Sequence, residues 1–247
     1  MVTDRAVTTR DGHAIAAPVH RDELDAFQQA SSDELVLPVR KLVQGVSRDA
    51  DSKRAGEFYD TLSKEYKNEL LVAVLALSRS RSLFGESFDE PPICVSDDAV
   101  RPRQPMEVSV GADTIITGPT CGECPFSQWG SARGGKGKGQ ECRMSYNILC
   151  LDLDDEQPFI LRVQGASIKA WREYLTLGRF KRTPAYALET MIGSDEKVFE
   201  AGKAHVLRFR VGNPLDQELA EAMRAQAAAY RGADLGVAEE PDELPFE

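Results

Sequence analysis

The chain has 247 residues, of which 42% are hydrophobic and 28% charged, with a formal net charge of −10 at pH 7. This is an ordinary globular mix with enough chain for one large domain or two small ones. The acidic total excludes a histone-like polybasic binder of nucleic acids, but it is compatible with a basic groove beside an acidic segment. No run approaches about 18 consecutive apolar residues, and the N-terminus lacks the apolar core of a signal peptide, so we expect a cytoplasmic protein without a membrane span.

The first third of the chain predicts a polar arm followed by two strands. Residues 1–33 hold mixed charges without strong periodicity, which predicts a loosely ordered arm with a helix around residues 21–30. Residues 35–43 predict a strand with a bulge or at a sheet edge, because Pro38 lies inside it. Residues 70–77 (LLVAVLAL) suit a buried strand, and if it continues, Arg79 and Arg81 share one face.

The remaining elements follow a long connection, residues 85–120, whose Gly, Pro, Asp and Ser content predicts irregular structure. Residues 146–153 and 159–163 predict a hairpin with its turn at 154–157. Residues 167–177 predict a helix, with Ser167 as N-cap and Gly178 as its stop. Two strands, 185–192 and 205–211, and an amphipathic helix, 214–230, complete the pattern.

This order predicts a mainly β, α+β fold. A helix between the third and fourth strands is a feature of small Greek-key barrels such as the OB-fold. We therefore expect an OB-like Greek-key β-barrel over residues 34–231, with a zinc-pinned loop insertion at about residues 94–142 and a C-terminal helix. Residues 232–247 are expected to form a disordered acidic tail, because they hold six acids and no base.

The cysteines predict a structural zinc site. In the cytoplasm, five cysteines are more typical of metal ligands or core residues than of disulfides. Cys121 and Cys124 form a C-x2-C pair that can point two thiolates at one ion, and Cys142 is the clear third ligand. The fourth is Cys94 or Cys150; we favour Cys94, because Cys150 lies in an apolar run that suits a small buried side chain. An iron–sulfur cluster or a redox pair is the lesser alternative.

The segment between these ligands predicts contacts with single-stranded DNA. Phe126 and Trp129 precede a glycine-rich basic loop with Arg133, Lys136 and Lys138, which lacks the spacing of a P-loop. Rings that stack on bases beside cations that meet phosphates suit single strands. Residues 121–212 carry 14 Lys and Arg against 11 Asp and Glu, so this part is less acidic than the whole chain. We assign further cations to the same surface: Arg79, Arg81, Arg179, Lys181, Arg182, Arg208 and Arg210.

Two segments carry a resemblance to known families. The ending DELPFE resembles the acidic tips of bacterial and phage single-stranded DNA-binding proteins. The segment CGECPFSQWGSARGGKGKGQEC, with VRKLVQGVS upstream, is similar to a group of uncharacterised phage proteins in which CxxCP, an aromatic–Gly pair and a GKGK-like stretch precede another Cys. The likeness covers about residues 35–212. It implies bound zinc and a setting in phage DNA replication or recombination, in the cytoplasm of the bacterial host.

These observations predict a non-enzymatic, sequence-independent single-stranded DNA-binding protein of phage replication, recombination or repair. An acidic segment with an apolar tip can dock onto partner proteins, so we expect the tail to recruit replication or recombination proteins through Asp242, Glu243, Leu244, Pro245 and Phe246. One alternative is a zinc-containing protein-interaction or transcription adaptor without DNA binding. The other is an enzyme, but four cysteines leave zinc no open position. We interpret Asp152, Asp154, Asp155 and Glu156 as a hairpin turn rather than a magnesium cluster.

Overall fold

The computed structural model describes residues 36–45, 51–85, 91–104, 107–110, 113–116, 118–132, 139–199, 202–230 and 235. The chain divides into two units, residues 1–36 and 37–247, and the described residues other than Val36 belong to the second. The predicted arm of residues 1–33, its helix, and the tail apart from Leu235 lie outside the described residues. None of the helices in the described ranges is long and apolar enough to cross a membrane.

The fold is mainly β, with two α-helices. The strands are β1 (Val39–Leu42), β2 (Phe58–Asp60), β3 (Tyr66–Lys67), β4 (Leu70–Leu83), β5 (Cys94–Ser96), β6 (Glu107–Val110), β7 (Asp113–Ile116), β8 (Arg143–Asp152), β9 (Pro158–Gln164), β10 (Leu188–Phe199) and β11 (Gly202–Pro214). The helices are α1 (Ser167–Lys181) and α2 (Gln217–Ala229), with one-turn 3-10 helices at Ser52–Arg54, Pro125–Ser127 and Ala185–Ala187.

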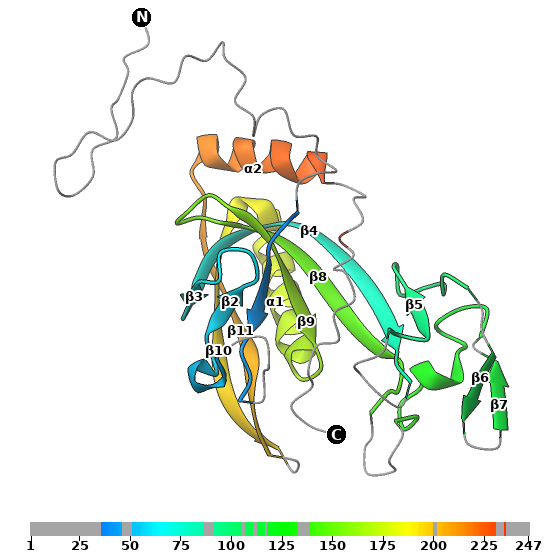
Figure 1. Cartoon of the computed structure of the whole chain (residues 1–247). Coiled ribbons are helices and arrows are strands. Elements are labelled where there is room, and N and C mark those ends of the chain that lie inside the picture. The colour runs from blue at the N-terminus through cyan, green and yellow to red at the C-terminus, as the bar shows by residue number, and fades with distance from the viewer. Residues whose placement is uncertain are drawn as a thin grey trace, which may run out of the picture. The chain divides into compact units, whose positions relative to one another are not determined.

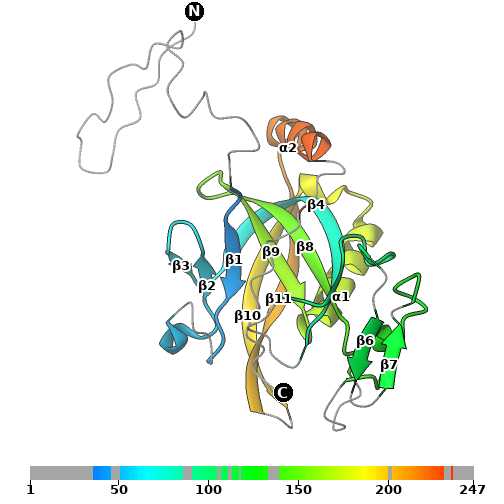
Figure 2. The same ribbon diagram turned by 45° about the vertical axis from the view of Figure 1, so that its right-hand side comes forward.

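Nine of these strands form one mixed sheet in the order β11-β10-β4-β8-β9-β1-β2-β3, with β5 also paired to β4. Strand β1 runs parallel to β9, whereas the other pairs are antiparallel. Strands β6 and β7 form a separate hairpin. Figures 1 and 2 show the large sheet curling around α1, so that it forms a half-barrel.

Several predicted elements are confirmed with shifted ends. The hairpin of β8 and β9 has its turn where the sequence places it, and β4 continues well past the apolar run because its ladder with β8 extends to the Ser82–Arg143 pair. Gly178 does not stop α1; the helix ends at Lys181, followed by Arg182 in the left-handed region.

Other expectations were wrong in detail. Ser167 is not the N-cap of α1 but lies inside the helix, where its hydroxyl accepts the N–H of Leu207 at 3.0 Å. Helix α2 is capped by Asp216 rather than started by Pro214. Residues 185–187 form a 3-10 turn ahead of β10, the segment 85–120 contains β5, β6 and β7, and the sequence pattern missed β2 and β3.

The curl of the sheet is built from a bulge and a side-chain bridge. Strand β4 pairs with β10 only at Leu70–Val72, and its register against β8 shifts between Val74 and Ala76. A bulge of this kind bends a strand and increases its twist. On the far side, the carboxamide of Gln44 donates to the carbonyl of His205 at 3.0 Å and accepts its N–H at 2.9 Å. The bridge ties the segment after β1 to β11.

Gly56 allows the close approach at this junction. It has φ of +94°, and a Cβ on it would lie 2.8 Å from the His205 ring. Its carbonyl accepts the hydroxyl of Ser194 at 2.6 Å. Any side chain at position 56 would therefore push β10 and β11 away from β1 and β2.

Two apolar clusters cover the two faces of the sheet. The inner cluster joins Trp171 and Tyr174 of α1 to residues from both sides of the curl, including Val72, Ile148 and Leu161. Trp171 stacks on Tyr174 with ring centroids 5.1 Å apart. On the outer face, Met223 of α2 packs over a second cluster. Each helix is therefore held by burial of its apolar face against the sheet.

A buried ion cluster fixes β1 against the β8–β9 turn. Arg40 on β1 is only 4% exposed, contacts Asp152, and lies 3.1 Å from Asp60 and 3.3 Å from Asp155. Lys67 on β3 lies 2.7 Å from both Asp152 and Asp155. Burial raises the pKa of the Asp152 carboxyl, but hydrogen bonds from Lys67 and Arg40 outweigh it, so the net pKa is lowered. The carboxylate therefore stays charged at neutral pH.

Replacing Asp152 with Asn should lower the free energy of unfolding by about 3 kcal/mol at pH 7, because Arg40 stays buried and loses a charged partner. Urea denaturation measures the change. Because the folded pKa of Asp152 is depressed, its stabilisation is complete above the ordinary carboxyl pKa of about 4 and is lost as the pH falls through the folded value. The difference in the free energy of unfolding between wild type and variant should therefore narrow in acid below about pH 4.

The matched control is Glu196→Gln, which removes the ion pair of Glu196 with Lys203, whose side chains are 48% and 66% exposed. Exposed pairs of this kind contribute little, so the stability should stay at the wild-type value. If the two substitutions lowered the free energy of unfolding equally, this would contradict a structural role for the buried cluster.

Candidate metal centre

Four cysteines from separate segments meet at the far end of the β4–β8 pair. Cys94 begins β5 and pairs with Leu83 at the end of β4, and Cys142 directly precedes β8. Cys121 and Cys124 flank the turn before the 3-10 helix Pro125–Ser127. All four line one cavity of about 10 Å³, together with Arg81, Ser96, Pro102 and Gly118.

Backbone hydrogen bonds hold the C-x2-C turn in place. The N–H of Cys121 donates to Val100 at 2.8 Å, that of Cys124 to Thr120 at 3.1 Å, and that of Cys142 to Phe126 at 2.8 Å. Gly118 packs against this turn so closely that a Cβ on it would lie 2.9 Å from the Cys124 nitrogen. These main-chain contacts therefore position the cysteines without any bound metal.

The thiols are buried and form no disulfide. Cys121, Cys124 and Cys142 are 5–7% exposed, and Cys94 is half-buried. Burial raises the pKa of Cys142 to about 12, although the charge of Arg81 opposes the shift. Burial, and then the neighbouring Cys124 and Cys121, raise the pKa of Cys94. A bound cation would instead lower the pKa of these thiols, since thiolates gain stability when they coordinate a metal.

The donor set fits zinc, although the side chains as placed do not yet surround an ion. Within the described ranges, no group of three or more His, Cys, Asp and Glu side chains is arranged to hold a metal. The residues lining the cavity nevertheless include four cysteines and no carboxylate or imidazole, which is the ligand set of a closed structural zinc site.

Cys150 lies elsewhere. It is fully buried on β8, opposite Val74 and Phe159, in the cluster under α1. Burial raises the pKa of its thiol. Its surroundings are those of a small apolar core residue.

The two aromatic residues of the zinc loop have opposite environments. Phe126 is 4% exposed and packs with Leu83, Cys124 and Cys142, so its ring is covered by its own fold and stacking on a DNA base, as the sequence predicts, would require it to leave this cluster. Trp129, three residues later, is 77% exposed. Arg133, Lys136 and Lys138 of the basic loop lie outside the described residues.

The predicted cations are spread over several surfaces. Arg81 lines the cysteine cavity and donates to the Cys142 carbonyl at 3.1 Å, while Arg79 is exposed beside it on β4. Arg208 pairs with Asp195 and lies 2.8 Å from Glu69, so its charge is largely compensated, whereas Arg210 is exposed.

The basic cluster Arg179, Lys181 and Arg182 is not brought to the cysteines. Helix α1 begins just after Gln164, whose partner Ser145 is close to Cys142 in sequence. Its 15 residues then carry the chain about 22 Å along the sheet. The sequence pattern missed Phe180 within this cluster, which is 77% exposed.

The sequence analysis also missed a row of polar residues on β8 and β9, which we call the polar stripe. Met144, Tyr146 and Ile148 belong to the inner cluster, so Arg143, Ser145 and Asn147 lie on the opposite face, where Asn147 pairs with Arg162 of β9. Asn147 is 1% exposed, and its carbonyl oxygen has no hydrogen-bond partner. The alternation of polar and apolar residues in RMSYNI is the signal that could have revealed this stripe.

Comparisons with other proteins add no further constraint. No family model, curated protein or solved structure matches the chain.

The purified chain should contain about one zinc ion per molecule, measured by mass spectrometry of the metal, because four thiolates complete one tetrahedron. Serine at position 94, 121, 124 or 142 should remove most of this zinc. Cys150→Ala is the matched control and should keep it. A wild-type chain without metal would contradict the site, and loss of zinc in Cys150→Ala but not in Cys94→Ser would reassign the fourth ligand.

Proposed function

We propose that the protein binds single-stranded DNA without sequence preference, on an OB-type barrel with a zinc-held loop. The supporting observation is the strand connectivity: β4, β8 and β9 form an antiparallel meander, α1 follows, and the β10–β11 hairpin returns to place β10 beside β4. The neighbour order β10-β4-β8-β9 is a Greek key, which supports a comparison with the OB-fold, here with β1 added beside β9. The bulge in β4 supports the same comparison, since it lets one strand serve both halves of the curl.

The topology indicates where a strand of DNA would lie. OB-folds bind oligonucleotides on the face of their second and third strands, between the loop joining strands one and two and the loop joining strands four and five. Here these are the outward face of β8 and β9, the segment 84–142 and the turn between β10 and β11. The cysteine centre therefore belongs to a loop that borders this face, and the partly exposed Arg143, Ser145 and Arg162 lie on it, whereas Asn147 is covered.

Trp129 is the best-placed residue for stacking. A tryptophan that is 77% exposed beside a compact cysteine centre gains nothing from burial in its own fold. Stacking on a base would cover its ring. Arg133, Lys136 and Lys138, in the same loop as Trp129, would supply cations for phosphates.

In this proposal zinc has a structural role and supplies no catalysis. Cys94, Cys121, Cys124 and Cys142 would hold it and keep the loop beside the barrel. The acidic residues of the β8–β9 turn do not favour an enzyme, because Asp152 and Asp155 are already neutralised by Arg40 and Lys67. The tail residues Asp242, Glu243, Leu244, Pro245 and Phe246 are proposed to recruit replication or recombination proteins.

Replacing Trp129 with Ala should weaken binding to a labelled oligo-dT by roughly five- to 150-fold, the loss expected for one stacked base. Fluorescence anisotropy at two salt concentrations measures it, and wild-type affinity should fall as salt rises. The control is Leu62→Ala, which removes a 65%-exposed side chain from the turn after β2. Wild-type protein that contains zinc but does not bind oligo-dT would reject the DNA role and favour a protein-interaction adaptor.

A further inference from the structure

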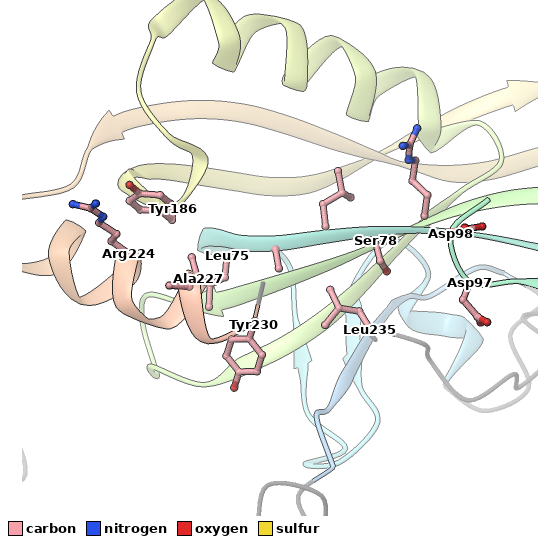
Figure 3. A pocket seen from close by; sticks show the side chains of 13 residues that line it. Leu75, Ser78, Asp97, Asp98, Tyr186, Arg224, Ala227, Tyr230 and Leu235 are labelled. Atoms are coloured by element: carbon pink, nitrogen blue, oxygen red, sulfur yellow. The ribbon is translucent and has the colours of Figure 1, made fainter. Parts of the chain in front are cut away.

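A groove of about 840 Å³ lies on the α2 side of β4 and ends beside the cysteine cavity, where the Ser96 hydroxyl of the cavity donates to Asp98 of the groove at 3.0 Å. Its floor is apolar and includes Leu75, Ala76 and Leu77 of β4, and one wall is the last turn of α2 with Ala227 and Ala228. Figure 3 shows Arg224 and Tyr186 at one end of the groove and Asp97 and Asp98 at the other. Nothing in the metal centre or the DNA proposal accounts for this groove.

One residue from beyond α2 is already seated in it. Leu235 is 3% exposed and packs in the outer cluster with Leu75 and Met223. It also lines the groove, and Figure 3 shows it across from Ser78. Leu235 therefore lies back on the sheet after α2, and residues 236–247 follow it in the sequence.

The two ends of the groove carry opposite charges. At the α2 end, Arg224 is exposed and forms no ion pair with another residue of the described ranges. At the other end, Asp97 pairs with Arg103 at 2.7 Å, and Asp98 accepts backbone N–H groups at 2.7 and 2.8 Å but keeps its negative charge. An extended segment with apolar side chains, and with its acids toward the Arg224 end, would complement such a surface.

We propose that this groove binds the C-terminal segment of the same chain, residues 236–247. The segment has five acids, Glu239, Glu240, Asp242, Glu243 and Glu247, and no base. It also has apolar residues for the floor, among them Val237, Leu244 and Phe246. Twelve extended residues span up to about 40 Å, which is ample to follow the groove from Leu235. DNA fits less well, because the floor is aliphatic.

The consequence is a competition for the tail. While the groove holds it, the tip Asp242–Phe246 is covered by its own chain, and a partner protein must displace it. The proposal does not rest on DNA binding, and its test contains no DNA in its main arm.

The test is limited proteolysis of the native full-length chain with a protease that cleaves after glutamate. Mass spectrometry follows cleavage after Glu239, Glu240 and Glu243, and the synthetic peptide 236–247 gives the rate of an unprotected segment. We expect cleavage in the wild-type chain to be at least tenfold slower than in the peptide. Arg224→Glu, which repels the acids, and Ala228→Trp, which fills the groove, should each restore fast cleavage. The control Lys197→Glu, on the exposed part of β10, should not.

Each outcome decides the proposal. Wild-type cleavage as fast as in the free peptide overturns it, even if both groove variants fail to fold. Protection that disappears on dilution shows that a second copy supplies the tail, which also overturns binding within one chain. If Arg224→Glu leaves cleavage unchanged but weakens oligo-dT binding, the groove is a DNA site instead.

Discussion

The antiparallel ladder between β4 and β8 places nearly every other feature of the molecule. It runs from the Val72–Asp152 pair to the Ser82–Arg143 pair, far longer than a typical strand of five or six residues. One end lies between the two apolar clusters, under α1 on one face and α2 on the other. The other end extends past both clusters, and there β5 and the cysteine turns gather. The same backbone bonds that close the core therefore also create a platform for the candidate metal centre.

Polar groups define the opposite edge of the sheet. A parallel strand such as β1 gains no local turn to fix its register, so it needs long-range contacts. Arg40 supplies them by contacting acids from β2 and from the β8–β9 turn, with its guanidinium 4.1 Å from the Phe159 ring. The Gln44 bridge to His205 then joins this edge to the β10–β11 hairpin. Burying these charges costs desolvation energy, and the pairing offsets it only in one arrangement of strands.

The candidate surfaces lie at different positions along the β4–β8 ladder. The cysteine cavity, Trp129 and the polar stripe of β8 and β9 lie toward the far end of the ladder, where a nucleic acid could be stacked and held. The groove under α2 lies nearer the core and has an aliphatic floor with Arg224 at its rim. The two proposals, DNA binding and tail binding, therefore rest on different residues and can be tested independently.

The sequence by itself determined the features that depend on local pattern. The apolar run of β4, the β8–β9 hairpin and both helices follow from periodicity and turn residues, and the C-x2-C pair marks the cysteine turn. Only the tertiary structure decided which side chains are available. Phe126 and Trp129 are equivalent in the sequence, but packing against Leu83 buries the first and leaves the second exposed. Arg40 meets Asp152 across 112 residues, and Cys94 rather than Cys150 joins the cavity because β5 pairs with the end of β4. Burial and ion pairing are sums over contacts that are distant in the chain, and no local pattern contains them.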